Sequence, residues 1–131
     1  MVMGEKTGKN KDGIRKPRRR KTISQSVRKR VYEKYHGRCA YCGQPIRYDE
    51  MQVDHIEARY LGGDDDLANY NPACRMCNFY KSTKSLEIFR DDLAMLQRRL
   101  QKVYIYRLAL RYGLVKEEKA EVTFYFEKED V

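Results

Sequence analysis

Four cysteines in two Cys-x-x-Cys pairs constrain what this chain can fold into more than any other feature. Cys39 and Cys42 form the first pair, Cys74 and Cys77 form the second, and residues 43–73 lie between them. Two intervening residues allow both sulfurs of a pair to bind one ion, and four thiolates with no open position are typical of structural zinc. The pattern therefore predicts zinc, with two disulfides or four cysteines buried as small apolar side chains as the alternatives.

Length and composition favour the metal. The chain has 131 residues, of which 41% are hydrophobic and 36% are charged, so we expect one domain with extensions and a small core. A small core usually needs a disulfide or a metal cross-link. The basic N-terminus has no apolar stretch behind it, and no run of about 18 apolar residues occurs, so we expect neither a secretion signal nor a membrane span. In a cytoplasmic protein the cysteines stay reduced, and paired cysteines then indicate metal binding.

The positive charge of the chain is concentrated at its N-terminus. Residues 1–30 contain 12 Lys or Arg and 2 acidic residues, a balance of +10, whereas residues 31–131 contain 16 and 17, a balance of −1. A dense basic block repels itself, which predicts a disordered arm over residues 1–22. The natural partner of such an arm is nucleic acid, and a solvated tail that only aids solubility is the alternative. The candidate nucleic-acid contacts in the arm are Arg18, Arg19, Arg20 and Lys21.

Local patterns predict the elements that surround the cysteines. The stretch "SVRKRVYEKYHG" predicts a helix that begins at Ser24 or Ser26 and ends at Gly37. The segments "PIRY" and "QVDHIEA" are expected to pair as two strands across the acidic turn between them. The aspartates at positions 64–66 are interpreted as a solvated turn in the loop that follows. The second cysteine pair is expected to open a helical turn.

The C-terminal part of the chain has a helical pattern from Ser85 to about Gly113. Its apolar side chains recur at spacings of three and four residues, which indicates either packing on the small core or dimerisation. Arg107 interrupts the pattern and predicts a bend near residues 102–106. The alternating segment "AEVTFYFEKE" predicts a late strand that needs a partner. We therefore divide the chain into the arm, a core domain over residues 23–84, and a helical extension with a short terminal strand over residues 85–131.

A resemblance to a known family rests on the segment between and just after the cysteine pairs. Asp54 stands directly before His55, and Asn78 directly follows the last cysteine. The pattern C-x2-C…VDHI…GG…N-x4-C-x2-C-N-x2-K, within residues 28–84, resembles the HNH endonucleases with a four-cysteine zinc site. The resemblance implies an α+β fold with a small ββα-metal core, stapled by zinc and flanked by helices. The matching residues are Cys39, Cys42, Asp54, His55, Gly62, Gly63, Asn69, Cys74, Cys77, Asn78 and Lys81.

The resemblance also implies roles for individual residues. His55 would be the general base that deprotonates water, a task suited to imidazole because it exchanges protons near neutral pH. Asp54 and Asn78 would hold a divalent ion through oxygen, which favours Mg²⁺ or Mn²⁺. Asn69 would brace the loop and orient the histidine, with Asn71 as the alternative residue for this role. Lys81 would contact a phosphate.

The function expected from these features is that of a metal-dependent DNA endonuclease or nickase, in the cytoplasm of a bacterial or phage-infected cell. RNA stays open as a substrate. A non-catalytic zinc module that binds nucleic acid is the alternative from another class. An interaction protein that uses residues 85–131 to form a homodimer, or to dock on a larger complex, is a third reading and is compatible with nuclease activity.

Overall fold

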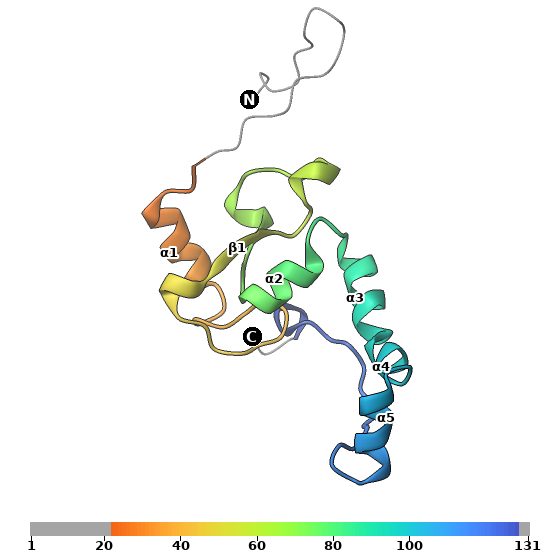
Figure 1. Cartoon of the computed structure of the whole chain (residues 1–131). Coiled ribbons are helices and arrows are strands. Elements are labelled where there is room, and N and C mark those ends of the chain that lie inside the picture. The colour runs from red at the N-terminus through yellow and green to blue at the C-terminus, as the bar shows by residue number, and fades with distance from the viewer. Residues whose placement is uncertain (1–21, 129–131) are drawn as a thin grey trace, which may run out of the picture.

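The structure of the chain is a computed structural model that describes residues 22–128 (Figure 1). A two-stranded sheet and helix α2 lie at its centre, with α1 on one side. Helices α3, α4 and α5 lead away on the other side, and the last described segment returns to the centre. The predicted basic arm, with Arg18, Arg19, Arg20 and Lys21, lies outside the described residues.

The central unit is a ββα arrangement. Strands β1 (Gln52–His55) and β2 (Tyr70–Ala73) pair antiparallel, and α2 (Arg75–Lys81) follows β2 at once. In this register Asp54 is opposite Asn71, and His55 is opposite Tyr70. The predicted α+β class and ββα core are therefore confirmed.

The predicted partner of β1 is wrong. The "PIRY" segment makes one isolated bridge, between Arg38 and Pro45, and the chain then enters a 3₁₀ turn at Tyr48–Glu50. The 3₁₀ turn ends the extended backbone directly before β1, so this segment cannot run alongside the strand. The partner of β1 is instead the fully buried "YNPA" segment, which follows the long loop.

Helix α1 (Gln25–Glu33) confirms the predicted first helix, with Ser24 as its cap: the Ser24 hydroxyl oxygen accepts from the Val27 N–H at 3.2 Å. The helix ends at Glu33, earlier than expected. His36 and Gly37 both have positive φ, at 58° and 75°, and this left-handed backbone turns the chain toward the first cysteine pair.

The predicted C-terminal helix is divided in three: α3 (Leu86–Ala94), α4 (Leu96–Leu100) and α5 (Tyr104–Arg111). The breaks fall at Met95 and at residues 101–103, the second of which agrees with the expected bend near residues 102–106. Among the described residues, no helix has the length and apolar character needed to cross a membrane.

The predicted C-terminal strand is wrong, because residues 120–124 have no regular structure and Tyr125–Glu127 form a 3₁₀ turn. The Glu127 carboxylate accepts from the Phe124 N–H at 3.2 Å and pairs with Arg90 at 2.6 Å, which curls the backbone. The segment still finds a partner within its own chain. The N–H groups of residues 125 and 126 donate to the carbonyls of Tyr41 and Ala40, at 3.0 and 2.8 Å.

One aromatic core joins the predicted nuclease domain to the predicted extension. Tyr41, Phe89 and Phe124 are each at most 2% exposed. The rings of Phe89 and Phe124 stack at 5.1 Å, and the Tyr41 ring meets both of them edge-on. Residues on both sides of position 84 therefore build a single core around Cys39.

Candidate functional site

The four cysteine sulfurs gather at one point, all within 4.8 Å of one another. Cys42 Sγ lies 3.8 Å from Cys74 Sγ, and the four cysteines are free of disulfides. A tetrahedral zinc ion with Zn–S bonds of about 2.3 Å holds its sulfurs about 3.8 Å apart. The spacing of the cluster therefore fits a zinc ion, and the disulfide alternative is wrong.

Two short turns build this cluster. In the first, the Gly43 N–H donates to the Cys39 carbonyl at 3.0 Å, and Gly43 has a φ of +79° that other residues rarely adopt. In the second, Cys74 precedes α2, and its sulfur accepts from the Cys77 N–H at 3.4 Å. The second cysteine pair therefore opens a helix, as predicted.

Charge also argues for a cation among the sulfurs. A hydrogen bond with Cys77 lowers the pKa of Cys39 to about 4, whereas burial raises the pKa of Cys42 to about 11. One thiolate is thus stable in the cluster, and further thiolates at this separation need a cation to offset their mutual repulsion.

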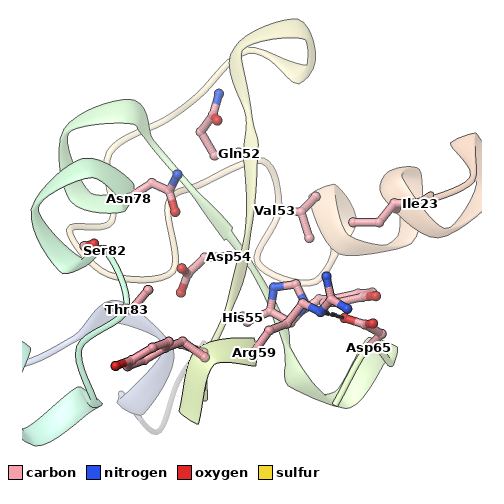
Figure 2. A pocket seen from close by; sticks show the side chains of 13 residues that line it. Ile23, Gln52, Val53, Asp54, His55, Arg59, Asp65, Asn78, Ser82 and Thr83 are labelled. Atoms are coloured by element: carbon pink, nitrogen blue, oxygen red, sulfur yellow. Dashed lines mark hydrogen bonds and ion pairs between the residues drawn. The ribbon is translucent and has the colours of Figure 1, made fainter. Parts of the chain in front are cut away.

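A pocket lined by residues of β1, α2 and the loop after β1 contains the predicted catalytic residues. Asp54, His55 and Asn78 all line it. Figure 2 shows Asn78 on α2 and Asp54 on β1 facing the same space, with His55 further along the strand. Neighbouring side chains on a strand alternate between its faces. Both Asp54 and His55 nevertheless reach this pocket, and α2 brings Asn78 to it.

Asp54 is held in the protein interior with its countercharge. Its side chain is 6% exposed, accepts a hydrogen bond from the Tyr41 hydroxyl, and lies 3.1 Å from Lys81 Nζ. Burial raises the pKa of the Asp54 carboxyl, while the Tyr41 hydrogen bond and the Lys81 charge act in the opposite direction. Tyr41 and Lys81 therefore offset part of the desolvation of this carboxyl group, and the net effect still raises its pKa.

The structure corrects the predicted role of Lys81 as a phosphate contact. The side chain is fully buried, and its ammonium donates to the His55 carbonyl at 2.9 Å besides pairing with Asp54. An ammonium in this position cannot reach a phosphate in solution. The packing of α2 on β1 buries this ammonium beside the Asp54 carboxylate, whose charge it neutralises.

Replacing Lys81 with methionine should lower the free energy of unfolding by about 3–5 kcal/mol, because it leaves the buried Asp54 carboxylate without its cation. Urea denaturation of the zinc-loaded protein measures the change. Lys84→Met is the matched control, since Lys84 pairs with Asp92 at 2.6 Å near the surface, where an ion pair contributes about 0–1 kcal/mol. Equal losses in the two variants would contradict the buried role of Lys81.

His55 has a partner that sequence reasoning missed. Its Nε2 lies 2.8 Å from Asp65 Oδ1, and its ring meets the Tyr70 ring edge-on at 5.2 Å. Asp65 was expected in a solvated turn, yet its side chain is only 11% exposed and also pairs with Arg59 at 3.2 Å. The available signal was the Gly-Gly turn, which lets the loop reverse and return toward β1.

That reversal depends on Gly63, where an added Cβ would lie 1.7 Å from the Glu57 carbonyl oxygen. The Asn69 side chain binds the same loop through three hydrogen bonds, each of 2.9 Å. Its oxygen accepts from the Glu57 N–H, and its nitrogen donates to the Glu57 and Asp64 carbonyls. Asn71, the alternative brace, is fully buried opposite Asp54. The loop contacts thus belong to Asn69, while the contact with the imidazole comes from Asp65.

Comparisons with known proteins find a similarity to HNH endonucleases. The family model described as HNH endonuclease matches residues 39–84. The crystal structure of the Type II-C Cas9 enzyme from Actinomyces naeslundii is similar at a TM-score of 0.48 and 29% identity. That similarity covers 56% of this chain and 9% of the Cas9 chain. A search of curated proteins gives no match. The HNH endonuclease model thus matches the part of the chain that holds the four-cysteine cluster and the pocket residues Asp54, His55 and Asn78.

Proposed function

We propose that this protein is a metal-dependent endonuclease that hydrolyses DNA phosphodiester bonds. The observation that carries the proposal is that Asp54, His55 and Asn78 line one pocket, beside a cysteine cluster that joins the first cysteine turn to the start of α2. An imidazole and two oxygen donors around one phosphate are the groups that such a hydrolysis needs.

His55 acts as the general base. Its Nε2 is engaged with Asp65, so Nδ1 is the nitrogen left to accept a proton from water. The water oxygen then forms a bond to phosphorus as the bond from phosphorus to the leaving sugar oxygen breaks in line with it. The proton taken from water stays on the imidazole until it returns to solvent.

Asp54 and Asn78 fit a hard divalent ion. Mg²⁺ is commonly held by one or two carboxylates and keeps several waters. The Asp54 carboxylate has about four acceptor sites, so it keeps capacity beside Tyr41 and Lys81. When bound, such an ion neutralises charge on the phosphate and stabilises the leaving oxygen. The cysteine cluster, closed by four sulfurs, has a structural role instead.

DNA is the proposed substrate because basic and aromatic groups surround the pocket. Arg75, on the exposed side of α2, lines a groove together with Gln52, Asn78 and Phe79. Residues 18–21 would add affinity that is independent of sequence and sensitive to salt. The rival function is a zinc module that binds nucleic acid without cutting it.

Incubation of the zinc-loaded protein with supercoiled plasmid separates these functions. We expect nicked or linear product when Mg²⁺ or Mn²⁺ is added. We expect no product when the zinc-loaded protein is incubated without either ion. Asp54→Asn and Asn78→Ala should raise the Mg²⁺ concentration needed for half-maximal rate or remove activity, because the first removes the charge of the carboxylate ligand and the second removes an oxygen ligand. Asp49→Asn, at an exposed carboxylate paired only with Arg47, is the control. Unchanged metal dependence in both pocket variants would reject them as ligands.

Self-association through the C-terminal helices stays a prediction. Leucine and isoleucine side chains on α4 and α5 are exposed, for example Ile105 at 74% and Leu100 at 44%. Removal of everything after Ser85 would also remove Phe89 and Phe124 from the core, so point substitutions on these helices are the suitable test.

A further inference from the structure

We infer that Asp65 is a positioning residue that sets the tautomer of His55. The expected effect of Asp65 on the cleavage rate rests on the proposed function. The hydrogen bond and the tautomer are properties of the protein without substrate and do not depend on it. In the neutral ring, one nitrogen carries the proton and the other accepts one. Only the unprotonated nitrogen can take a proton from water, so the tautomer decides which edge of the ring can act as a base in the pocket.

The contact between the two side chains defines the answer. His55 Nε2 lies 2.8 Å from Asp65 Oδ1, within hydrogen-bond distance. An ionised carboxylate can only accept, so Nε2 must donate and carry the proton. Nδ1 is then left with a free lone pair. The side chains are 19% and 11% exposed, so water competes little for this bond.

Asp65 is itself held in place. Arg59 Nε lies 3.2 Å from the same carboxylate oxygen and pairs with it. On one side of Asp65, Asn69 binds the carbonyl of residue 64 at 2.9 Å. On the other, the side chain of residue 66 accepts from the Ala68 N–H at 2.7 Å. Hydrogen bonds at residues 64 and 66 therefore hold the backbone on both sides of Asp65.

The imidazole is also restricted in rotation. Tyr70, directly opposite His55 in the sheet, meets the ring edge-on with an interplanar angle of 85°. The Tyr70 contact limits the plane of the ring, and the Asp65 contact defines which edge faces the loop. Together they leave the Nδ1 edge turned away from Asp65 (Figure 2). Nδ1 is therefore the ring nitrogen that can take a proton from water.

The tautomer can be measured directly, because the chain has only two histidines, His55 and His36. Long-range ¹H–¹⁵N correlation spectra of the zinc-loaded protein at pH 8 distinguish a protonated ring nitrogen from an unprotonated one. We expect the Nε2–H form at His55 in the unmodified protein. In Asp65→Ala we expect a mixture of both tautomers at His55 and no change at His36.

Cleavage kinetics give the second readout. Asp65→Ala should lower kcat on plasmid about 10–100-fold with little change in KM, because substrate binding does not use this carboxylate. Asp65→Asn keeps an oxygen that can accept from Nε2–H, so it should recover part of the rate and most of the tautomer preference. Asp64→Asn, at the exposed neighbouring carboxylate, should match the unmodified protein in both readouts.

The outcomes separate the inference from the proposed function. If Asp65→Ala and Asp65→Asn both keep the tautomer of the unmodified protein, Asp65 does not set it and the inference is overturned. If the tautomer responds as expected but the unmodified protein cuts no DNA, the inference stands and the proposed function fails. Should the alanine variant lose its cooperative melting, Asp65→Leu decides the question, because leucine fills a similar volume and accepts no hydrogen bond: loss of the Nε2–H preference supports the inference, and its retention overturns it.

Discussion

Alanine in place of His55 is expected to reduce the rate of plasmid cleavage by about 10²–10⁴-fold, which is the usual contribution of a general base. The reason is geometric: His55 is the titratable nitrogen base of the pocket, and Asp54 beside it is already engaged with Tyr41 and Lys81. The initial rate of conversion of supercoiled plasmid, with saturating Mg²⁺, measures the effect.

The control for this variant is His36→Asn. His36 is exposed and has a φ of 58°, a conformation that asparagine tolerates well, so the substitution should leave the fold and the rate unchanged. Zinc content and affinity for DNA should be unchanged in both histidine variants. Full cleavage by the His55 variant would refute its assignment as the base.

Serine in place of Cys42 is expected to release the zinc and unfold the domain. Cys42 is exposed, so the change from sulfur to oxygen removes a metal ligand with little loss of packing. Structural zinc contributes roughly 10 kcal/mol or more of apparent binding free energy, which is also folding free energy when the metal-free core is small. We expect the variant to contain less than one zinc per chain by elemental analysis and to lose its cooperative thermal transition.

Met76→Ser is the matched control for the zinc experiment, because Met76 is 83% exposed on the helix that begins with the second cysteine pair. It should keep its zinc and melt like the unmodified protein. A strong chelator should abolish the cooperative thermal transition of the unmodified protein, as the cysteine substitution does. A melting curve that resists the chelator would contradict the structural role of the metal.

Local sequence patterns predicted the parts of the fold that depend on near neighbours. Ser24 caps α1 and the second cysteine pair opens α2, as expected from residues three or four positions apart. The approach of the two sulfurs within each pair also follows from a local turn, because each Cys-x-x-Cys presents its sulfurs from one turn of backbone. Asp54, His55 and Asn78 were expected near one another from the family resemblance, and they line one pocket.

Contacts between distant residues were not predictable in this way. Strand pairing is non-local, so the choice of residues 70–73 over the "PIRY" segment depended on burial of the whole strand. Lys81 and Asp65 resemble ordinary surface charges in the sequence. Each is withdrawn from solvent only because the packed chain places an opposite charge beside it, Asp54 for Lys81 and Arg59 for Asp65.

The amino-acid sequence by itself determined the two cysteine turns and the starts of α1 and α2, since these depend on spacing along the chain, and the resemblance to the HNH endonucleases supplied the candidate catalytic residues. The tertiary structure alone decided which strand pairs with β1, that Lys81 serves Asp54 rather than a phosphate, and that Asp65 binds His55. The physical reason is that burial turns a solvated charge into one that needs a partner, and only the folded chain brings that partner within reach.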